Sequence, residues 1–154
     1  STQVGGSEAL RNQLGKMIDN DPGPCLYVLP SEQACKEAVE ERLKPLVENT
    51  PALRSHLVGD DPITQRKITF DTMSIYLGWA GSPQSLASRP CRYVILDEID
   101  KYPSFAGREA DPVSLAEERT ATFGHRRRVL KTSTPTTRQG AIWKAYEACG
   151  EKRH

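Results

Sequence analysis

The stretch that most constrains how this chain can fold is residues 93–100, which read Tyr-Val-Ile-Leu-Asp-Glu-Ile-Asp. Four apolar residues in a row, from Tyr93 to Leu96, predict a strand buried on both faces, as the strands of parallel sheets are. The apolar run stops at two carboxylates, Asp97 and Glu98. Open α/β sheets bind ligands beyond the carboxyl ends of their strands. The pattern therefore predicts a ligand site that contains both acids.

The two acids suit different steps of phosphoryl transfer. Mg²⁺ binds few carboxylates and completes its shell with water and phosphate oxygens, so Asp97 would hold the ion through its waters. Glu98, one residue further along, would orient and deprotonate an attacking water. A strand that simply ends in a polar turn would carry the same two acids. A phosphate-binding loop upstream would favour the first interpretation.

A candidate for that loop lies at the start of the chain. Gly5, Gly6 and Ser7 precede apolar residues at three- and four-residue steps, which predict a helix over about residues 7–19. Free backbone N–H groups at a helix start favour phosphate. The standard phosphate loop reads G-x-x-x-x-G-K-[ST], and here Gly6 stands where the lysine belongs. A glycine turn with Ser7 as the N-cap is the alternative.

Strands and helices alternate along the rest of the chain, which predicts one domain with a parallel sheet. Residues 67–77 alternate in polarity and predict a β-hairpin beside the main sheet, in which Trp79 would pack rather than stack on a base. The other expected elements are a strand at 25–29, a helix at about 32–47 that Ser31 caps and Pro45 kinks or ends, a helix at about 115–122, a strand at 128–132, and a helix at about 140–149 with Ile142, Trp143 and Tyr146 facing inward.

If the strands are parallel, three polar loops lie on one rim of the sheet, at residues 2–7, 97–100 and 132–135. A glycine-rich loop, paired acids and a hydroxyl cluster are the components of a nucleoside triphosphatase, which works mainly by positioning and charge stabilisation. Ser133 and Thr134 would hydrogen-bond the γ-phosphate or the second acid and so sense hydrolysis. A plain strand-ending turn is the alternative for these two hydroxyls.

Composition narrows the class of protein. The 154 residues are 37% hydrophobic and 27% charged, which is ordinary for a globular domain, and the net charge of +1 gives no overall basic field. A basic run at residues 125–128, with Lys131, is either a phosphate contact or a solvated turn. No apolar run is long enough to span a bilayer and no signal peptide opens the chain. The four cysteines lack metal-site spacing, so we expect a reduced, intracellular protein without structural zinc.

Taken together, these stretches resemble the ATPase domain of the large terminase subunits of tailed bacteriophages, in particular the lambda-type group. The resemblance covers nearly the whole chain in order. The matching stretches are Gln3-Val-Gly-Gly-Ser7, Asp21-Pro-Gly-Pro24, Thr50-Pro-Ala-Leu53, Gly81-Ser-Pro-x-x-Leu86, Ser88-Arg-Pro-x-Arg-Tyr-Val-Ile-Leu-Asp-Glu-Ile-Asp-Lys-Tyr-Pro103, Leu115-Ala-Glu-Glu-Arg119 and Ser133-Thr-Pro135.

The resemblance implies an α/β P-loop NTPase of the additional-strand, RecA- and helicase-like class. It implies ATP and Mg²⁺ as cofactors and ATP-driven translocation of double-stranded DNA into an empty capsid. The partners would be a small terminase subunit, a portal protein and further copies of the same chain, in the host cytoplasm and away from membranes. Nucleotide would be bound by Gln3, Val4, Gly5, Gly6, Ser7, Glu8, Ser133 and Thr134, with Ser7 and Asp97 at the metal and Glu98 and Arg119 as catalytic residues.

The sequence departs from the family pattern in its phosphate loop. The family lysine often stands at the front of the loop, which would place it just ahead of Ser1, and Gln3 replaces any arginine inside the loop. We therefore expect residues 1–154 to be one ATPase domain cut within its phosphate loop and lacking the nuclease domain, with weak or absent activity alone. Arg119 is a candidate charge-stabilising arginine, acting across a subunit boundary, or a partner of the local glutamates.

Two other functions stay open at this stage. The first is a helicase-like ATPase that remodels nucleic acid, which a second motor domain downstream would favour, whereas the hairpin and the Ser-Thr-Pro turn favour a terminase. The second is a non-catalytic P-loop module that binds DNA or a protein partner. The missing lysine supports the non-catalytic module. Ser7, Asp97 and Glu98 argue against it, because a P-loop protein that has lost catalysis has no physical need for both acids beside a hydroxyl.

Overall fold

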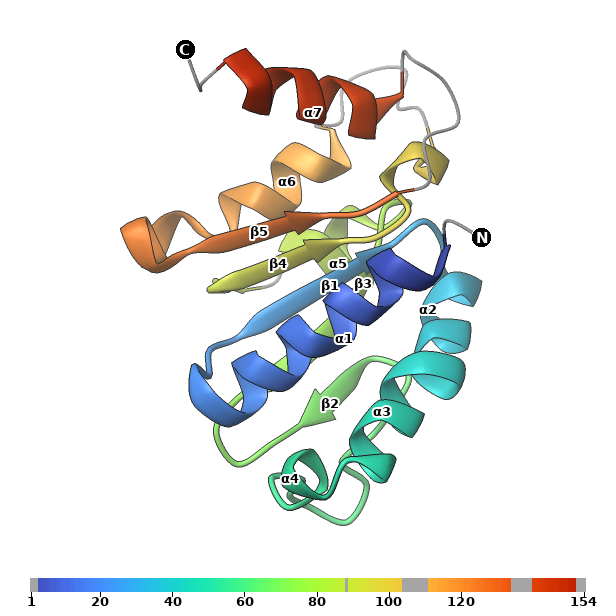
Figure 1. Cartoon of the computed structure of the whole chain (residues 1–154), viewed down its shortest axis with the longest axis vertical. Helices are drawn as coiled ribbons and strands as arrows, with labels where there is room; N and C mark the ends of the chain where they lie inside the picture. The colour runs from blue at the N-terminus through green and yellow to red at the C-terminus, as the bar shows by residue number, and fades with distance from the viewer. Residues whose placement is uncertain (1–2, 88, 104–110, 134–139, 152–154) are drawn as a thin grey trace.

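A five-stranded sheet forms the centre of the computed structural model, which describes residues 3–87, 89–103, 111–133 and 140–151 (Figure 1). The strand order is β2-β3-β1-β4-β5. The pairs β1–β3, β1–β4 and β4–β5 are parallel, and β2–β3 is an antiparallel hairpin. This arrangement confirms the predicted α/β class with a mostly parallel sheet. The strands are β1 (Cys25–Leu29), β2 (Lys67–Thr69), β3 (Ser74–Trp79), β4 (Tyr93–Leu96) and β5 (Arg128–Lys131).

Helices cover both faces of the sheet, and each face has its own apolar core. Tyr27 and Leu29 of β1 join the core under the first helices, while Leu26 and Val28 join the core on the other face. Successive strand residues point to opposite faces, so a strand covered on both sides must be apolar throughout. The first face carries α1 (Gln3–Asn20), α2 (Glu32–Ala38), α3 (Lys44–Asn49) and α4 (Pro51–Arg54), and the second carries α5 (Pro83–Ala87) and α6 (Pro112–Glu118).

The helix predicted over residues 32–47 is divided by a π-helical segment, η1 (Val39–Leu43). Ser31 caps its start as expected, since its Oγ accepts a hydrogen bond from Ala34 N at 3.1 Å. Pro45 does not end the helix, because α3 continues to Asn49. The residue four positions before the proline, Glu41, lies in η1. A proline removes the hydrogen bond to that carbonyl and its ring clashes with it, so the irregular segment stands where Pro45 disturbs the helix.

Three further expectations are corrected by the structure. Helix α1 begins at Gln3 rather than near Ser7, so the Gly-Gly-Ser stretch has helical backbone. Strand β3 is an integral strand of the main sheet, between β2 and β1, instead of lying beside it. Tyr146 is 73% exposed on α7 (Ala141–Glu151), so it does not face inward, whereas Ile142 packs against the second core.

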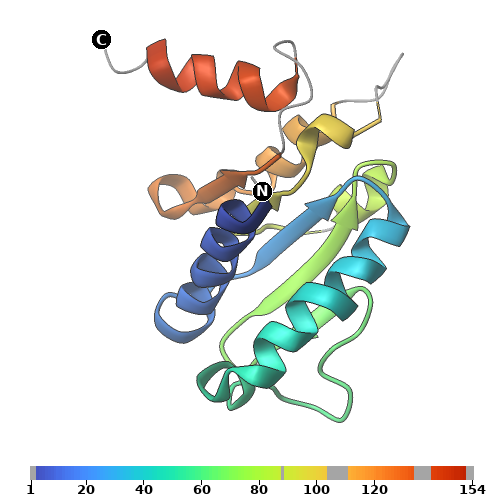
Figure 2. The same ribbon diagram turned by 45° about the vertical axis from the view of Figure 1, so that its right-hand side comes forward.

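Two short 3₁₀ segments complete the described chain: η2 (Ile99–Lys101) follows β4 and η3 (Ala121–Arg126) precedes β5. Figure 2 shows α7 set apart from the helices that cover the sheet, close to the end of the chain. Among the helices that the structure describes, none has the length and apolar character needed to cross a bilayer.

Candidate active site

The loops that follow β4 and β5 are held together by backbone hydrogen bonds at the carboxyl edge of the sheet. Asp97 N donates to Val28 O at 2.9 Å, Thr132 N donates to Leu96 O at 2.8 Å, and Ile99 N donates to Thr132 O at 3.3 Å. These bonds continue the parallel ladder one residue beyond the strands. They confirm the prediction that the acids after β4 and the polar turn after β5 lie on one rim.

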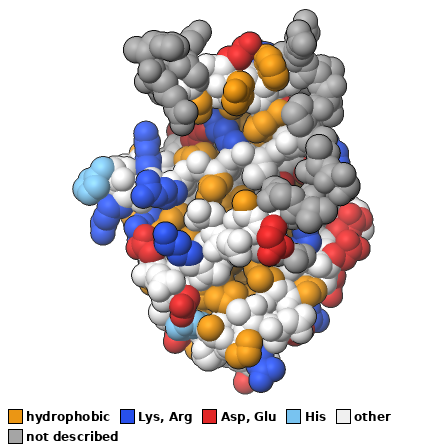
Figure 3. All heavy atoms as spheres, in the orientation of Figure 1, with side chains coloured by type: hydrophobic (Ala, Val, Ile, Leu, Met, Phe, Trp, Pro, Cys, Tyr) orange, Lys and Arg blue, Asp and Glu red, His pale blue; other side chains and the backbone are white. Residues whose placement is uncertain are grey.

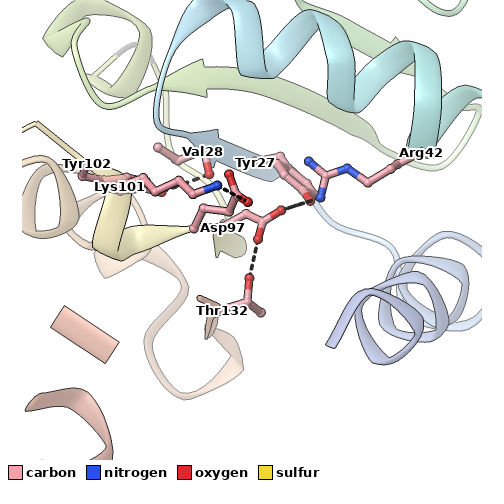
Figure 4. Close-up of polar contacts among 8 residues, drawn as sticks. Tyr27, Val28, Arg42, Asp97, Lys101, Tyr102 and Thr132 are labelled. Atoms are coloured by element: carbon pink, nitrogen blue, oxygen red, sulfur yellow. Dashed lines mark hydrogen bonds and ion pairs between the residues drawn. The ribbon is translucent and has the colours of Figure 1, made fainter. Parts of the chain in front are cut away.

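Asp97 lies at the centre of a buried polar cluster (Figure 4). Its Oδ1 accepts a hydrogen bond from Thr132 Oγ1 at 2.6 Å. Its Oδ2 accepts from Tyr27 OH at 2.8 Å and from Arg42 Nη1 at 2.9 Å. Asp97 is only 6% exposed. A buried carboxylate is tolerated when donors of this kind satisfy it, and three donors from three different elements fix both of its oxygens.

The ionisation of the cluster follows from burial and from its neighbours. Burial and the negative charge of Asp97 raise the pKa of Tyr27 well above its usual range, so Tyr27 stays a hydrogen-bond donor. Burial disfavours the charged form of Arg42, but the charge of Asp97 and the hydrogen bond to it outweigh that effect and raise the pKa of Arg42. Arg42 is therefore a fixed cation next to the acid.

Glu98 has a backbone conformation that few residues adopt. Its φ of 54° and ψ of 44° are left-handed, and no other non-glycine residue in the described part of the chain has a positive φ. Such a conformation costs on the order of 1–2 kcal/mol and is concentrated at functional sites. The Glu98 side chain is 38% exposed, and its Oε1 lies 2.9 Å from Lys101 Nζ. The two acids therefore differ: Asp97 is buried and fixed, while Glu98 borders solvent.

Ser133 and Asp100 link this rim to the last helix. Ser133 Oγ accepts a hydrogen bond from Asp100 N at 3.2 Å, and Asp100 Oδ1 accepts one from Ile142 N in the first turn of α7 at 3.0 Å. Ser133 thus contacts the loop that carries both acids through Asp100, and its predicted contact with the γ-phosphate or Glu98 stays a prediction. Thr134 lies outside the described residues.

The beginning of α1 lies at the same rim of the sheet, on the right of Figure 1, where β1, β4 and β5 end. The backbone of Gln3, Val4, Gly5, Gly6 and Ser7 belongs to this helix, and Glu8 is exposed on it. An 18-residue helix directs its free N–H groups and positive dipole end toward that rim. The predicted phosphate-binding stretch is therefore near the acids, as helix rather than as open loop.

Arg119 is not brought together with the acids. Its backbone oxygen accepts a hydrogen bond from Cys91 N at 2.9 Å, so it lies at the amino end of β4, opposite Asp97. Its Nη1 donates to Ala87 O at 3.1 Å, and its Nη2 lies 3.5 Å from Glu118 Oε2. The structure thus contains the ion pair with a local glutamate that was the alternative for this arginine.

Sequence reasoning missed three residues of the site, Tyr27, Arg42 and Lys101, and placed Thr132 in a rim loop without giving it a role. Tyr27 resembles any other aromatic residue in an apolar strand, and only its buried hydroxyl needs a partner. Arg42 falls in η1, where the wider turn shifts side chains off the ordinary helical spacing. Thr132 stood next to the predicted Ser133. Parallel pairing of Leu96 with Lys131 could have located Thr132 opposite Asp97.

The donor set fits Mg²⁺ better than a metal that needs many protein ligands. No group of three His, Cys, Asp or Glu side chains able to hold a metal is found among the residues described. Mg²⁺ typically takes one or two protein oxygens and fills its shell with water and phosphate. A buried carboxylate with a hydroxyl 2.6 Å away, at a rim that also carries a helix start, is compatible with that requirement.

Comparisons with known proteins give the family of the chain and a similar fold. The family model of the phage terminase large subunit gpA, ATPase domain, matches residues 1–154. Among solved structures, the large terminase of bacteriophage HK97 is similar, with a TM-score of 0.71 and 11% sequence identity over 97% of this chain. The match spans 31% of the HK97 chain. A comparison with curated proteins finds no match. The chain belongs to the family of phage terminase large subunit gpA ATPase domains.

Proposed function

We propose that this chain is the ATP-hydrolysing motor domain of a DNA-packaging terminase, and that it drives double-stranded DNA into the capsid. The observation that carries the proposal is the position of Asp97: a buried carboxylate, directly after β4, at the rim where α1 begins. The family of ATPase domains to which the chain belongs supports the chemistry.

In this proposal Asp97 holds the water shell of Mg²⁺, and Ser7 contributes a hydroxyl ligand. The ion, when bound, supplies positive charge against the phosphate oxygens. The backbone of Gln3, Val4, Gly5, Gly6 and Glu8 binds the phosphates through the N–H groups of the helix start. Tyr27 and Thr132 position Asp97, since both hold its oxygens through hydrogen bonds.

Glu98 is the proposed base, which accepts a proton from the attacking water. Its exposed side chain is accessible to a water, which the fixed and buried Asp97 is not. The ion pair with Lys101 competes for Glu98 Oε1 and must loosen before the carboxylate contacts water. Ser133 and Thr134 are proposed to respond to the γ-phosphate, and Ser133 already contacts the loop that holds Glu98.

Arg119 requires a second subunit to act on nucleotide, because it lies at the edge opposite Asp97. A charge-stabilising role for it therefore belongs with the proposal that the motor is a homo-oligomer. The small terminase subunit and the portal protein are the further partners we propose, and the host cytoplasm is the proposed location. The match to a gpA ATPase family model favours this motor over a helicase-like remodelling ATPase or a non-catalytic binding module.

Calorimetry of Mg²⁺-ATP binding tests the proposal, using this chain and a chain extended upstream of Ser1. We expect the extended chain to bind Mg²⁺-ATP and the present chain to bind it weakly or not at all. The loss of one cationic contact to phosphate, that of the expected lysine ahead of Ser1, should lower the affinity at least several-fold. Binding by neither chain would leave a non-catalytic module. In the extended chain Glu98→Gln should bind ATP but lose turnover; retained turnover would remove Glu98 as the base.

A further inference from the structure

A second polar surface lies at the far side of the sheet, on the hairpin. We call it the hairpin patch and define it by Lys67, Tyr76 and Arg89. Strand β2 is the edge strand, and Lys67 pairs with Tyr76 of β3. Tyr76 is level with Leu26 of β1 and Val94 of β4, and its ring packs against the core on the face that α5 and α6 cover. The patch therefore lies on that face of the sheet, away from the rim that carries Asp97.

Aromatic rings hold the cations of the patch in place. The Arg89 guanidinium carbon lies 4.1 Å from the centroid of the Tyr76 ring, and Lys67 Nζ lies 5.5 Å from the same centroid. On the opposite face of the sheet, outside the patch, the Arg66 guanidinium carbon lies 4.3 Å from the centroid of the Trp79 ring. A guanidinium that stacks on a ring keeps its N–H edge free for hydrogen bonds and loses little further entropy when it binds an anion.

The cations of the patch are uncompensated, whereas Arg66 on the opposite face pairs with Glu32, whose Oε1 lies 2.9 Å from Arg66 Nη2. Lys67 and Arg89 have no ion pair within the portion of the chain that is described, although they share one ring. Ser82, Gln84 and Ser85 border the same concavity, whose volume is about 490 Å³. Two neighbouring cations without a carboxylate, beside side chains that can hydrogen-bond, are complementary to an anion.

We propose that the hairpin patch binds the phosphate backbone of double-stranded DNA. The choice of duplex DNA rests on the proposed packaging function. A motor that translocates DNA must contact every sequence, and cations on phosphates give affinity without sequence information. The proposal assigns no base contact to the patch, because contacts to phosphates are sufficient for binding that does not depend on sequence.

The basic run at residues 125–128 is the competing surface. Its side chains are exposed and form the group of blue and pale blue side chains on the left of Figure 3. None of Arg126, Arg127 and Arg128 stacks on a ring in the described structure. Their long side chains must therefore lose more conformational freedom on binding than Arg89 would.

Fluorescence anisotropy of the 154-residue chain with a labelled random-sequence duplex tests the proposal, at several salt concentrations and without nucleotide. We expect Arg89→Ala and Lys67→Ala each to weaken binding by about five- to tenfold and to lower the salt slope by about one phosphate contact. Arg54→Ala removes an exposed arginine from α4 and is the matched control, with unchanged affinity expected.

The aromatic residues give a readout that charge alone does not. Tyr76→Leu keeps every cation, so we expect weaker binding with an unchanged salt slope, while Tyr76→Phe keeps the ring and should bind like the wild type. Melting curves of each variant exclude unfolding as the cause.

Three results would overturn the proposal. Equal losses of DNA affinity in Arg54→Ala and Arg89→Ala would mean that DNA binds through general surface charge. Losses confined to variants of Arg126, Arg127 and Arg128 would assign the DNA contact to the basic run. Competition by polyglutamate as strong as that by DNA would indicate an acidic protein partner. Because no nucleotide is present, each of these leaves the ATPase proposal untouched, and failure of ATP binding would leave the DNA measurement intact.

Discussion

Arg42 Nη1 lies 2.9 Å from Asp97 Oδ2, so the acid that follows β4 is paired with a cation from the π-helical segment of the first crossover. A guanidinium thus neutralises the carboxylate that we propose for the metal's waters. Binding of Mg²⁺-nucleotide would have to displace or share this contact. Single π-turns inside helices are frequent at functional sites, and here the turn places Arg42 on Asp97.

Replacing Arg42 with alanine tests how much this pair contributes. Asp97 would keep two neutral donors but lose its charged partner in a site that is nearly closed to solvent. We expect the free energy of unfolding to fall by about 1–3 kcal/mol, since Arg42 itself is a third exposed. Urea unfolding with and without Mg²⁺ measures this, and Mg²⁺ should stabilise the variant more than the wild type.

Lys44→Ala is the control for Arg42→Ala. Lys44 lies 3.9 Å from Glu40 on the exposed side of the same helical run, and an exposed pair of this kind contributes about 0.3–0.5 kcal/mol. An equal loss of unfolding free energy in both variants would contradict this prediction. Equal stabilisation of Arg42→Ala and the wild type by Mg²⁺ would also contradict it, because Arg42 would then not occupy the position of a bound cation next to Asp97.

Tyr27→Phe tests the second donor to Asp97 without changing charge. The hydroxyl is buried and its removal leaves an apolar ring of nearly the same volume. We expect the free energy of unfolding to fall by about 1–2 kcal/mol, because a hydrogen bond to a charged acceptor is lost. Tyr146→Phe, at a residue that is 73% exposed, should change stability by less than about 0.5 kcal/mol. Chemical denaturation of both variants makes the comparison.

The part of the site that follows from strand pairing was predictable from the sequence. A buried apolar run ending in Asp97 and Glu98, and a second strand ending in Thr132 and Ser133, place four polar side chains on one rim once the strands are parallel. The continuous apolar runs at residues 25–29 and 93–96 predicted β1 and β4 with their observed bounds. Local pattern therefore determined where the acids lie.

The part that depends on helix irregularity was not predictable. The spacing of the apolar residues does not indicate the π-helical segment η1, so the contact between Arg42 and Asp97 could not be predicted from the sequence. Glycines usually mark loops, yet the backbone at Gly5 and Gly6 is helical in this structure. Tyr146 continues the helical apolar spacing of α7, but the first turn of α7 is held to Asp100 of η2 and Tyr146 is left exposed. Tertiary context overrides propensity at each of these positions.

Gly140→Ala tests the contact between the acid loop and α7. A Cβ at Gly140 would overlap Asp100 Oδ2 and lie 2.9 Å from Asp100 Cγ. Asp100 would have to move, which weakens its hydrogen bond to Ile142 N. We expect a loss of about 1 kcal/mol, as for a helix that loses its capping side chain, and faster hydrogen exchange of the α7 amides.

The same substitution at Gly15 is the control. A Cβ there meets only Leu53 Cδ1 at 3.9 Å, an ordinary contact in the middle of α1. Alanine is favoured over glycine in a helix by about 0.5–1 kcal/mol, so Gly15→Ala should stabilise the protein and leave α7 exchange unchanged. A stabilising Gly140→Ala would mean that Asp100 is not held against α7 as described.

His56 predicts a pH dependence of stability. Its Nδ1 lies 2.8 Å from Asp71 Oδ1 and its Nε2 lies 3.4 Å from Asp19 Oδ1. Hydrogen bonds to these two carboxylates raise the pKa of His56 above its ordinary value of 6.5. A raised pKa in the folded state means that the charged form is favoured by folding. The stabilisation is therefore complete below the unfolded pKa and is lost as the pH rises through the folded pKa.

Melting temperatures measured from mildly acidic to mildly alkaline pH check this dependence. We expect the melting temperature of the wild type to fall above pH 6.5 and that of His56→Gln to stay flatter over the same window. His125→Gln removes an exposed histidine from η3, away from Asp71 and Asp19, and should keep the wild-type slope. Equal slopes in wild type and His56→Gln would mean that the two carboxylates do not hold a charged His56 in the folded protein.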